Sequence, residues 1–400
     1  MPLRRVLFWS HLVAGVSAGV VILLMSLTGV ALMYERQILA WADSGYRSNA
    51  PSPSATRLPL ESVVERMRTA RPDVQPSALT VRSNADAPVT VAAGQRTFYV
   101  DAYRGTVVGE ASRTGARAAM STLREWHRWL AMSGDERATG RAITGWSTLV
   151  FLGIVCSGIY LWLPKRWAWQ NVRAVVLFRP GLQGKARDFN WHNVIGIWSA
   201  VPLFFVVLSA LPISFPWANA AVYHAVGENP PPPPARPATT NEELRTRTRK
   251  VEPGTRNLEV AFARAAREVQ GWRSIAVRLP ASPEGYVFTI DRGDGGQPHL
   301  RDTLTVAASG QVVKFEPFSS QTLGRRLRSI SRFTHTGEVL GLAGQTVAGM
   351  VSAGAVVLVW TGLALAYRRI RAAIRSPWSV VRKAPQRATD YGQRTDPDPI

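Results

Sequence analysis

Residues 189–215 read FNWHNVIGIWSAVPLFFVVLSALPISF, and this stretch decides the class of fold. From residue 193 onward it carries no charged side chain. About 20 predominantly apolar residues let a helix cross roughly 30 Å of hydrocarbon, so residues 193–215 are expected to span a membrane. Similar runs lie at residues 11–33, 142–163 and 342–366. The sequence therefore predicts an α-helical membrane protein with four transmembrane helices.

The positions of the basic residues predict how these helices are oriented. The connection between the second and third spans contains six Lys or Arg residues and one acid, Asp188. Basic residues also precede the first span and follow the fourth, and short basic segments stay on the cytoplasmic side. Both termini are therefore predicted to be cytoplasmic in a bacterial inner membrane, with the segments at about 34–141 and 216–341 in the periplasm. The net charge of +21 mostly reflects this topology, and we predict no nucleic-acid partner.

The N-terminal run is expected to remain as the first span rather than to be cleaved as a signal peptide. It is longer than the apolar core of a signal peptide, about 7 to 15 residues, and bulky residues follow it. The single cysteine, Cys156, lies inside the second span, which excludes a disulfide within the chain.

Each of the two periplasmic segments is predicted to form a small α+β module. Leu60, Val63, Val64 and Met67 have helical spacing, and the stretches LTVRS, VTVAA and TFYVDAYRGTVVGE that follow alternate like strands. The second segment repeats this order, with a helix in LEVAFARAAREVQ and then strands, which indicates an internal duplication. A stretch with five consecutive prolines precedes it and is predicted to be a stiff linker.

Four of the six histidines lie at or just before the start of the spans: His11, His127, His192 and His335. A polar ring close to hydrocarbon needs a partner, and a repeated position favours a shared role as ligand. The predicted orientation places His11 and His192 near the cytoplasmic side and His127 and His335 near the periplasmic side. The pattern predicts two pairs of metal or haem ligands, although a single interfacial histidine is more often structural.

The other two histidines carry weaker signals. His224 follows the third span on the outer side and is an alternative outer ligand or substrate contact, with an ordinary surface position as the simpler interpretation. His299 lies in a glycine-rich turn and is expected to be exposed.

Several phrases together resemble the PepSY-associated transmembrane family of iron-regulated inner-membrane proteins, whose members include ferric-siderophore reductases. They are the histidine-led spans, HTGEVLGLAGQ (335–345), WLPKRW (162–167) and YVDAYRGTVVGE (99–110). The resemblance extends to about residue 370 and implies four helices, periplasmic PepSY domains and b-type haem held by histidines. The chain departs from the family at Leu12, where an arginine often follows the histidine.

The resemblance and the residue pattern give a complete division of the chain. Its segments are 1–36 (first transmembrane helix), 37–117 (PepSY-like module), 118–164 (interfacial helix and second transmembrane helix), 165–190 (cytoplasmic loop), 191–226 (third transmembrane helix), 227–254 (proline-rich linker), 255–318 (second PepSY-like module), 319–370 (interfacial helix and fourth transmembrane helix) and 371–400 (cytoplasmic tail).

These observations predict a di-haem oxidoreductase that moves electrons across the membrane and reduces ferric siderophore iron in the periplasm. Two haem b groups are expected, and arginines near the ligands are candidates for their propionates: Arg124, Arg128 and Arg332 outside and Arg5 inside. Ferrous iron is held less tightly by the oxygen ligands of a siderophore, so reduction releases it.

The electron donor is predicted to be a quinol, a separate flavoprotein or a small reductant, because no GxGxxG phrase in a nucleotide-binding context is found in the cytoplasmic parts. The alternative is a non-redox PepSY membrane protein that binds peptides or regulates a peptidase, with structural histidines. A transporter is less favoured, since four spans without broken, charged helices offer little for alternating access.

Overall fold

The computed structural model describes residues 2–52, 54–112, 114–164, 167–232, 255–279 and 281–381. Residues 233–254 of the predicted proline-rich linker and residues 382–400 of the predicted tail lie outside the described residues.

Four long helices form the membrane part of the protein. They are α1 (Pro2–Leu32), α5 (Arg137–Trp162), α7 (Gly184–Ser214) and α12 (Gly341–Val381). Each is long and apolar enough to cross a bilayer, as the sequence predicts. Contacts run from α1 to α5, from α5 to α7, from α7 to α12 and from α12 back to α1, so the four helices close into a bundle.

Shorter helices lie at the two ends of this bundle. Those on the side of the sheet are α2 (Glu35–Ala42), α4 (Gly115–Trp129), α8 (Pro216–His224), α11 (Leu323–His335) and the 3₁₀ turn η4 (Glu338–Leu340). At the other end lies α6 (Trp169–Val176). Helix α4 ends abruptly because Leu130 and Ala131 have φ of 52° and 59°, a left-handed conformation that turns the chain back toward α5.

The extramembrane part is built on one antiparallel sheet of eight strands in the order β4-β3-β2-β1-β5-β6-β7-β8. The strands are β1 (Ala78–Arg82), β2 (Val89–Ala93), β3 (Arg96–Val100), β4 (Val107–Glu110), β5 (Ser274–Arg278), β6 (Tyr286–Asp291), β7 (Arg301–Val306) and β8 (Val312–Glu316). Alternation along β1 and β2 buries every second side chain. The buried residues pack under α3 (Leu60–Ala70) and α10 (Leu258–Glu268) in a single hydrophobic core.

The two predicted modules thus share one sheet instead of forming two separate ones. Strand β1 pairs with β5 over its full length, with Thr80 opposite Ala276. At the same seam the two helices cap each other: the Leu60 amide donates to Glu259 Oε2 at 3.0 Å and the Glu259 amide donates to Glu61 Oε1 at 2.9 Å. Glu61 and Glu259 both follow the first residue of their helix, which agrees with the predicted duplication.

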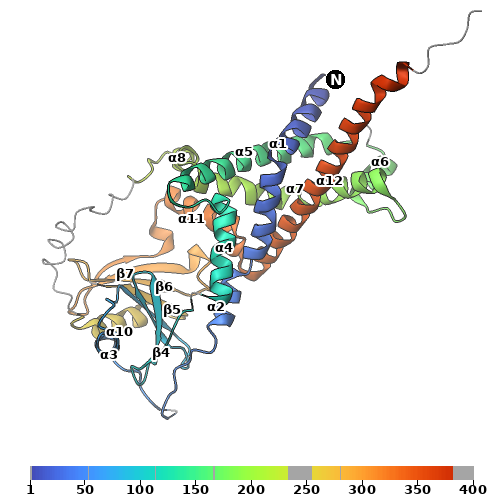
Figure 1. The fold of residues 1–400 in the computed structure, drawn as a ribbon. Helices are drawn as coiled ribbons and strands as arrows, with labels where there is room; N and C mark the ends of the chain where they lie inside the picture. The colour runs from blue at the N-terminus through green and yellow to red at the C-terminus, as the bar shows by residue number, and fades with distance from the viewer. Residues whose placement is uncertain are drawn as a thin grey trace, which may run out of the picture.

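The sheet lies at one end of the helix bundle (Figure 1). The start of α1, the far end of α12 and helix α6 all lie at the opposite end. The predicted topology requires this arrangement, because it puts both termini and the loop between the second and third spans on one side. Which side faces the cytoplasm stays a prediction.

Candidate functional site

The first histidine pair lies inside the bundle at the end away from the sheet. His11 on α1 and His192 on α7 have ring centroids 6.5 Å apart with planes at 84°. The other two helices supply a hydroxyl to each ring. His11 Nδ1 is 2.9 Å from Ser157 Oγ on α5, and His192 Nδ1 is 3.0 Å from Thr361 Oγ1 on α12. All four spans therefore contribute to this pair, which we call the inner pair.

The second pair, which we call the outer pair, lies at the end of the bundle nearest the sheet. His127 in the last turn of α4 and His335 at the end of α11 have ring centroids 6.1 Å apart with planes at 42°. His127 Nδ1 is 3.0 Å from Thr28 Oγ1 on α1, and His335 Nδ1 is 3.0 Å from the Val206 carbonyl on α7. The structure thus brings together the same two pairs that topology predicts from the sequence.

The hydrogen bonds define the tautomer of His335 and suit the same tautomer in the other three rings. The Thr28, Ser157 and Thr361 hydroxyls donate to backbone carbonyls of their own helices, at 2.7 Å, 3.1 Å and 2.7 Å. Each hydroxyl oxygen can then accept from histidine Nδ1–H, and the Val206 carbonyl can only accept. His335 therefore carries the proton on Nδ1 and leaves Nε2 unprotonated, which is the form that binds a metal, and the same tautomer satisfies the hydrogen bonds of the other three rings.

Burial supports the neutral form in the outer pair. Burial lowers the pKa of His127 to about 4, with a smaller contribution from the positive charge that His335 would carry. Burial is also the main cause that lowers the pKa of His335. Neutral imidazole is the metal-binding state, so these rings need no deprotonation before they bind.

Glycine residues seat three of the four rings. A Cβ added to Gly158 would lie 3.4 Å from His11 Cε1, one added to Gly29 would lie 3.4 Å from His127 Cε1, and one added to Gly362 would lie 3.3 Å from His192 Cε1. Each of these glycines directly follows the residue whose hydroxyl binds the same ring. The same arrangement thus recurs at three rings, each bound by a hydroxyl residue and the glycine that follows it: Ser157-Gly158, Thr28-Gly29 and Thr361-Gly362. We call these glycines the glycine seats. The sequence analysis missed this repeated pattern.

The dimensions of the pairs fit two axial ligands of one metal. A metal–imidazole bond is about 2.0–2.1 Å long and a ring centroid lies about 1.1 Å behind its nitrogen, so two rings on opposite sides of one metal have centroids about 6 Å apart. The observed separations are 6.5 Å and 6.1 Å. No group of three or more His, Cys, Asp or Glu in the described part of the chain is arranged to hold a metal ion. A haem takes its other iron ligands from the porphyrin, so two histidines are the number of protein ligands that it needs.

A comparison with protein families agrees with this arrangement of four spans. The model of the PepSY-associated TM region matches residues 8–369, which is most of the chain. The chain belongs to this family. Among curated proteins, no significant match is found. Both histidine pairs lie within the matched residues of this PepSY-associated transmembrane protein.

The four arginines predicted to contact propionates differ in their surroundings. Arg128 lies over the Trp129 ring at 4.7 Å and Arg332 over the Phe333 ring at 5.9 Å, both beside a histidine of the outer pair. Arg124 instead forms an ion pair with Glu35 at 3.2 Å. At the inner end Arg5 is exposed, whereas its neighbour Arg4 reaches the bundle and donates to the Leu161 carbonyl at 2.7 Å. A propionate contact stays a prediction for all four.

The other two histidines lie apart from both pairs. His224 is exposed at the end of α8, and His299 is exposed in the 3₁₀ turn η2 (Pro298–Leu300) as expected. Neither ring is paired with His127 or His335.

A buried acid anchors the inner pair between two spans. Asp188 is 2 % exposed and lies one helical turn before His192 on α7. Its carboxylate accepts from Arg187 at 2.9 Å and from Arg368 of α12 at 2.5 Å. Helices α7 and α12 are therefore joined by charge close to the point where Thr361 of α12 binds His192.

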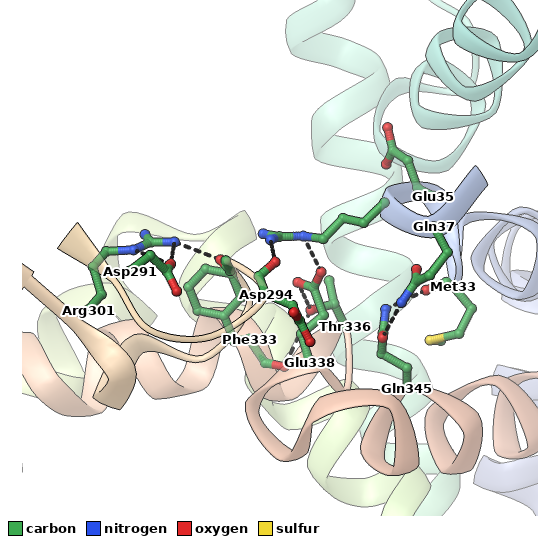
Figure 2. Close-up of polar contacts among 12 residues, drawn as sticks. Met33, Glu35, Gln37, Asp291, Asp294, Arg301, Phe333, Thr336, Glu338 and Gln345 are labelled. Atoms are coloured by element: carbon green, nitrogen blue, oxygen red, sulfur yellow. Dashed lines mark hydrogen bonds and ion pairs between the residues drawn. The ribbon is translucent and has the colours of Figure 1, made fainter. Parts of the chain in front are cut away.

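A second buried acid anchors the outer pair, and Figure 2 shows its surroundings. Glu338 is 9 % exposed, accepts from the Thr336 hydroxyl at 2.8 Å and forms an ion pair with Arg36. Arg36 also donates to the Asp294 carbonyl at 2.8 Å, in the loop between β6 and β7. This loop comes close because Gly295 and Gly296 have no side chains, and a Cβ at either would collide with Arg36 or Glu338.

A glutamine pair continues this network into the spans (Figure 2). Gln345 near the start of α12 is 4 % exposed; its Nε2 donates to the Met33 carbonyl at 2.9 Å and its Oε1 accepts from Gln37 at 2.8 Å. The segment that leads from His335 into α12 is thereby fixed to the end of α1, which also supplies the Thr28 hydroxyl to His127. The sheet, α1 and both outer histidines form one connected unit.

Proposed function

We propose that this protein is a di-haem membrane oxidoreductase that carries electrons across the bacterial inner membrane and reduces ferric siderophore iron in the periplasm. The observation that carries the proposal is the presence of two histidine pairs at opposite ends of one bundle, each with ring centroids about as far apart as those of two imidazoles on opposite sides of one metal. In this proposal the sheet is the periplasmic PepSY region, and both termini are cytoplasmic.

The residues of the chain would hold each haem by the two Nε2 atoms of a pair. Haem held in this way would supply a reversible one-electron centre. Ser157, Thr361, Thr28 and the Val206 carbonyl fix the rings, so little reorganisation accompanies electron transfer. The inner pair lies at the end of the bundle away from the sheet, and the outer pair lies at the end nearest the sheet, where a polar chelate would arrive in this proposal.

The electron would enter at the inner pair from a quinol or a separate flavoprotein and leave at the outer pair. A ferric siderophore is too polar to enter hydrocarbon, so the outer pair is where it meets the protein. One electron converts its ferric iron to ferrous iron, and the oxygen ligands then hold the metal less tightly. A non-redox peptide-binding protein needs no matched pair of rings at each end of its bundle, and for this reason we favour the redox function.

Haem content tests the proposal directly. We expect about two non-covalently bound b-type haems per chain in the purified protein, measured as pyridine haemochrome against protein concentration. His224→Ala and His299→Ala should keep both haems and serve as matched controls. A ratio near zero in protein expressed with adequate haem supply contradicts the proposal.

The direction of electron flow is tested with the reduced protein. A ferric siderophore added anaerobically should reoxidise it, and a ferrous chelator should capture the released iron. Loss of His335 should abolish this step. The proposed route is wrong if a His335→Ala variant that lacks the outer haem reduces the siderophore at the parental rate.

A further inference from the structure

The outer histidine pair is surrounded by arginines without acidic partners. Helix α11 carries four arginines and no acid. In the part of the chain that the structure describes, none of five arginines on α4, α5 and α11 forms an ion pair, whereas Arg124 and Arg36 nearby do. The five are Arg128, Arg137, Arg141, Arg328 and Arg332.

Contacts and electrostatics place these arginines close together. Arg137 and Arg128 both lie over the Trp129 ring, at 3.9 Å and 4.7 Å from its centroid. Arg128 is repelled by Arg332 of α11, by Arg141 of α5, and by Arg124 and Arg137. Arg332 in turn repels Arg328. The guanidinium groups of three helices therefore lie close together, with Arg128 near His127 and Arg332 near His335, and we call these five residues the arginine cluster.

The cluster carries more charge than two haem propionates neutralise. Its five guanidinium groups less two carboxylates leave a surplus of about three positive charges, since the pKa of arginine keeps it protonated. Like charges held together without a partner are unfavourable, and a protein surface that keeps them commonly attracts an anion. Guanidinium groups bind carboxylates bidentately, which suits a ligand rich in carboxylate oxygens.

We propose that the arginine cluster is the docking site for an anionic, carboxylate-bearing ferric chelate, in preference to a neutral or cationic one. The inference rests on the proposed function, because it assigns the substrate class of the same outer site. One electron passes from the protein to the docked ferric iron, which becomes ferrous, and no bond forms or breaks in that step. An anionic lipid headgroup would satisfy the same charges, so the test must separate the two ligands.

Binding is measured with chelates that the protein does not reduce. The haem-loaded full-length protein, in nanodiscs of zwitterionic phosphatidylcholine, is titrated by equilibrium dialysis with dianionic gallium–DTPA and with the neutral tris-hydroxamate complex gallium–desferrichrome. We expect the dianionic chelate to bind at low salt, to weaken steeply as salt rises, and to bind about tenfold more weakly in the double variant R137Q/R141Q. The neutral chelate should bind weakly and equally in both proteins.

Two controls make the result specific. R267Q/R278Q removes the same charge from the extramembrane part, away from the cluster, and should bind gallium–DTPA like the parent protein. Retention of both haem spectra in R137Q/R141Q shows that this variant is folded, and the salt dependence of the parent protein gives an independent readout. Equal binding of the neutral and dianionic chelates at low salt overturns the proposal.

A change of lipid composition tests whether the cluster binds a soluble chelate or an anionic lipid headgroup. If nanodiscs with phosphatidylglycerol abolish gallium–DTPA binding, the cluster is a headgroup site and the proposal is wrong. If binding persists, the soluble chelate is the ligand. The proposed redox function fails by a different result, namely when no ferric chelate of any charge reoxidises the reduced protein.

Discussion

The inner and outer histidine pairs have similar ring separations, 6.5 Å and 6.1 Å, but they are built differently. Both rings of the inner pair lie on membrane-spanning helices, and the other two spans hold them. Both rings of the outer pair lie on short helices, α4 and α11, whose positions depend on a left-handed turn, a 3₁₀ turn and the extramembrane sheet. The bundle alone defines the inner site, whereas the outer site also depends on the sheet.

Replacement of a ligand gives the largest expected effect. His11→Ala or His192→Ala should remove the inner haem and leave the outer one, and His127→Ala or His335→Ala should do the reverse, so that each variant keeps about one of two haems. Reduced-minus-oxidised spectra and haemochrome ratios measure this. If His11→Ala and His335→Ala deplete the same spectral component and His192→Ala spares it, the two pairs do not act as separate sites.

Substitution of the two buried acids should have the next largest effect and should affect the two haem sites separately. Asp188→Asn leaves Arg187 and Arg368 without their shared partner and should destabilise the protein by about 3 kcal/mol. Glu338→Gln should cost less, about 2 kcal/mol, because Glu338 pairs with one arginine where Asp188 pairs with two, and its side chain is 11 % exposed where that of Asp188 is 3 % exposed. The first change should loosen only the inner haem and the second only the outer one, as measured by thermal melts and by haem transfer to apomyoglobin.

An acid outside both sites provides the control for this experiment. Asp101 is 3 % exposed in the turn between β3 and β4 and accepts from the amides of Asn49, Tyr103 and Arg104 at 3.0 Å, 2.8 Å and 2.9 Å, none of them on a helix that carries a paired histidine. Asp101→Asn should lower stability without changing the rate of haem transfer. Equal loss of both haems in Glu338→Gln would show that the outer site does not depend on the sheet in the way described.

Substitution of the glycine seats should alter ligand orientation rather than occupancy. Gly362→Ala places a Cβ 3.3 Å from His192 Cε1, so that ring must shift by a few tenths of an ångström, whereas Gly29→Ala places one 3.4 Å from His127 Cε1, at the limit of an ordinary van der Waals contact. We expect a cost of about 1–2 kcal/mol and a changed low-temperature electron paramagnetic resonance spectrum for one haem at a time. Gly15→Ala and Gly153→Ala, where a Cβ meets nothing within 4 Å, should leave both signals unchanged.

Removal of a hydroxyl partner should have the smallest effect. Thr28→Val, Ser157→Ala and Thr361→Val each remove one hydrogen bond to Nδ1, worth about 0.5–1.5 kcal/mol. The reduction potential of the matching haem should rise modestly, because the ring becomes a weaker donor to the iron. Spectroelectrochemical titration measures the change; a shift of the inner potential in Thr28→Val would contradict the assignment of Thr28 to the outer ring.

Sequence patterns predicted most of the architecture because they depend on local physical chemistry. An uncharged apolar run must cross the bilayer as a helix, so the four spans could be read directly. The basic residues that flank the spans predicted which span ends lie on the same side of the membrane. That prediction alone paired His11 with His192 and His127 with His335. Alternation of apolar residues likewise gave the strands of both extramembrane segments.

Other features depend on contacts between distant segments and are decided only by tertiary structure. The rotation of each span selects Ser157, Thr361, Thr28 and the Val206 carbonyl as partners of the rings, and no local pattern determines that rotation. Both edges of a predicted sheet offer unpaired backbone groups, so the sequence did not show that β1 joins β5 in one sheet. The Arg36–Glu338 pair joins residues 302 positions apart along the chain, and only folding brings them together.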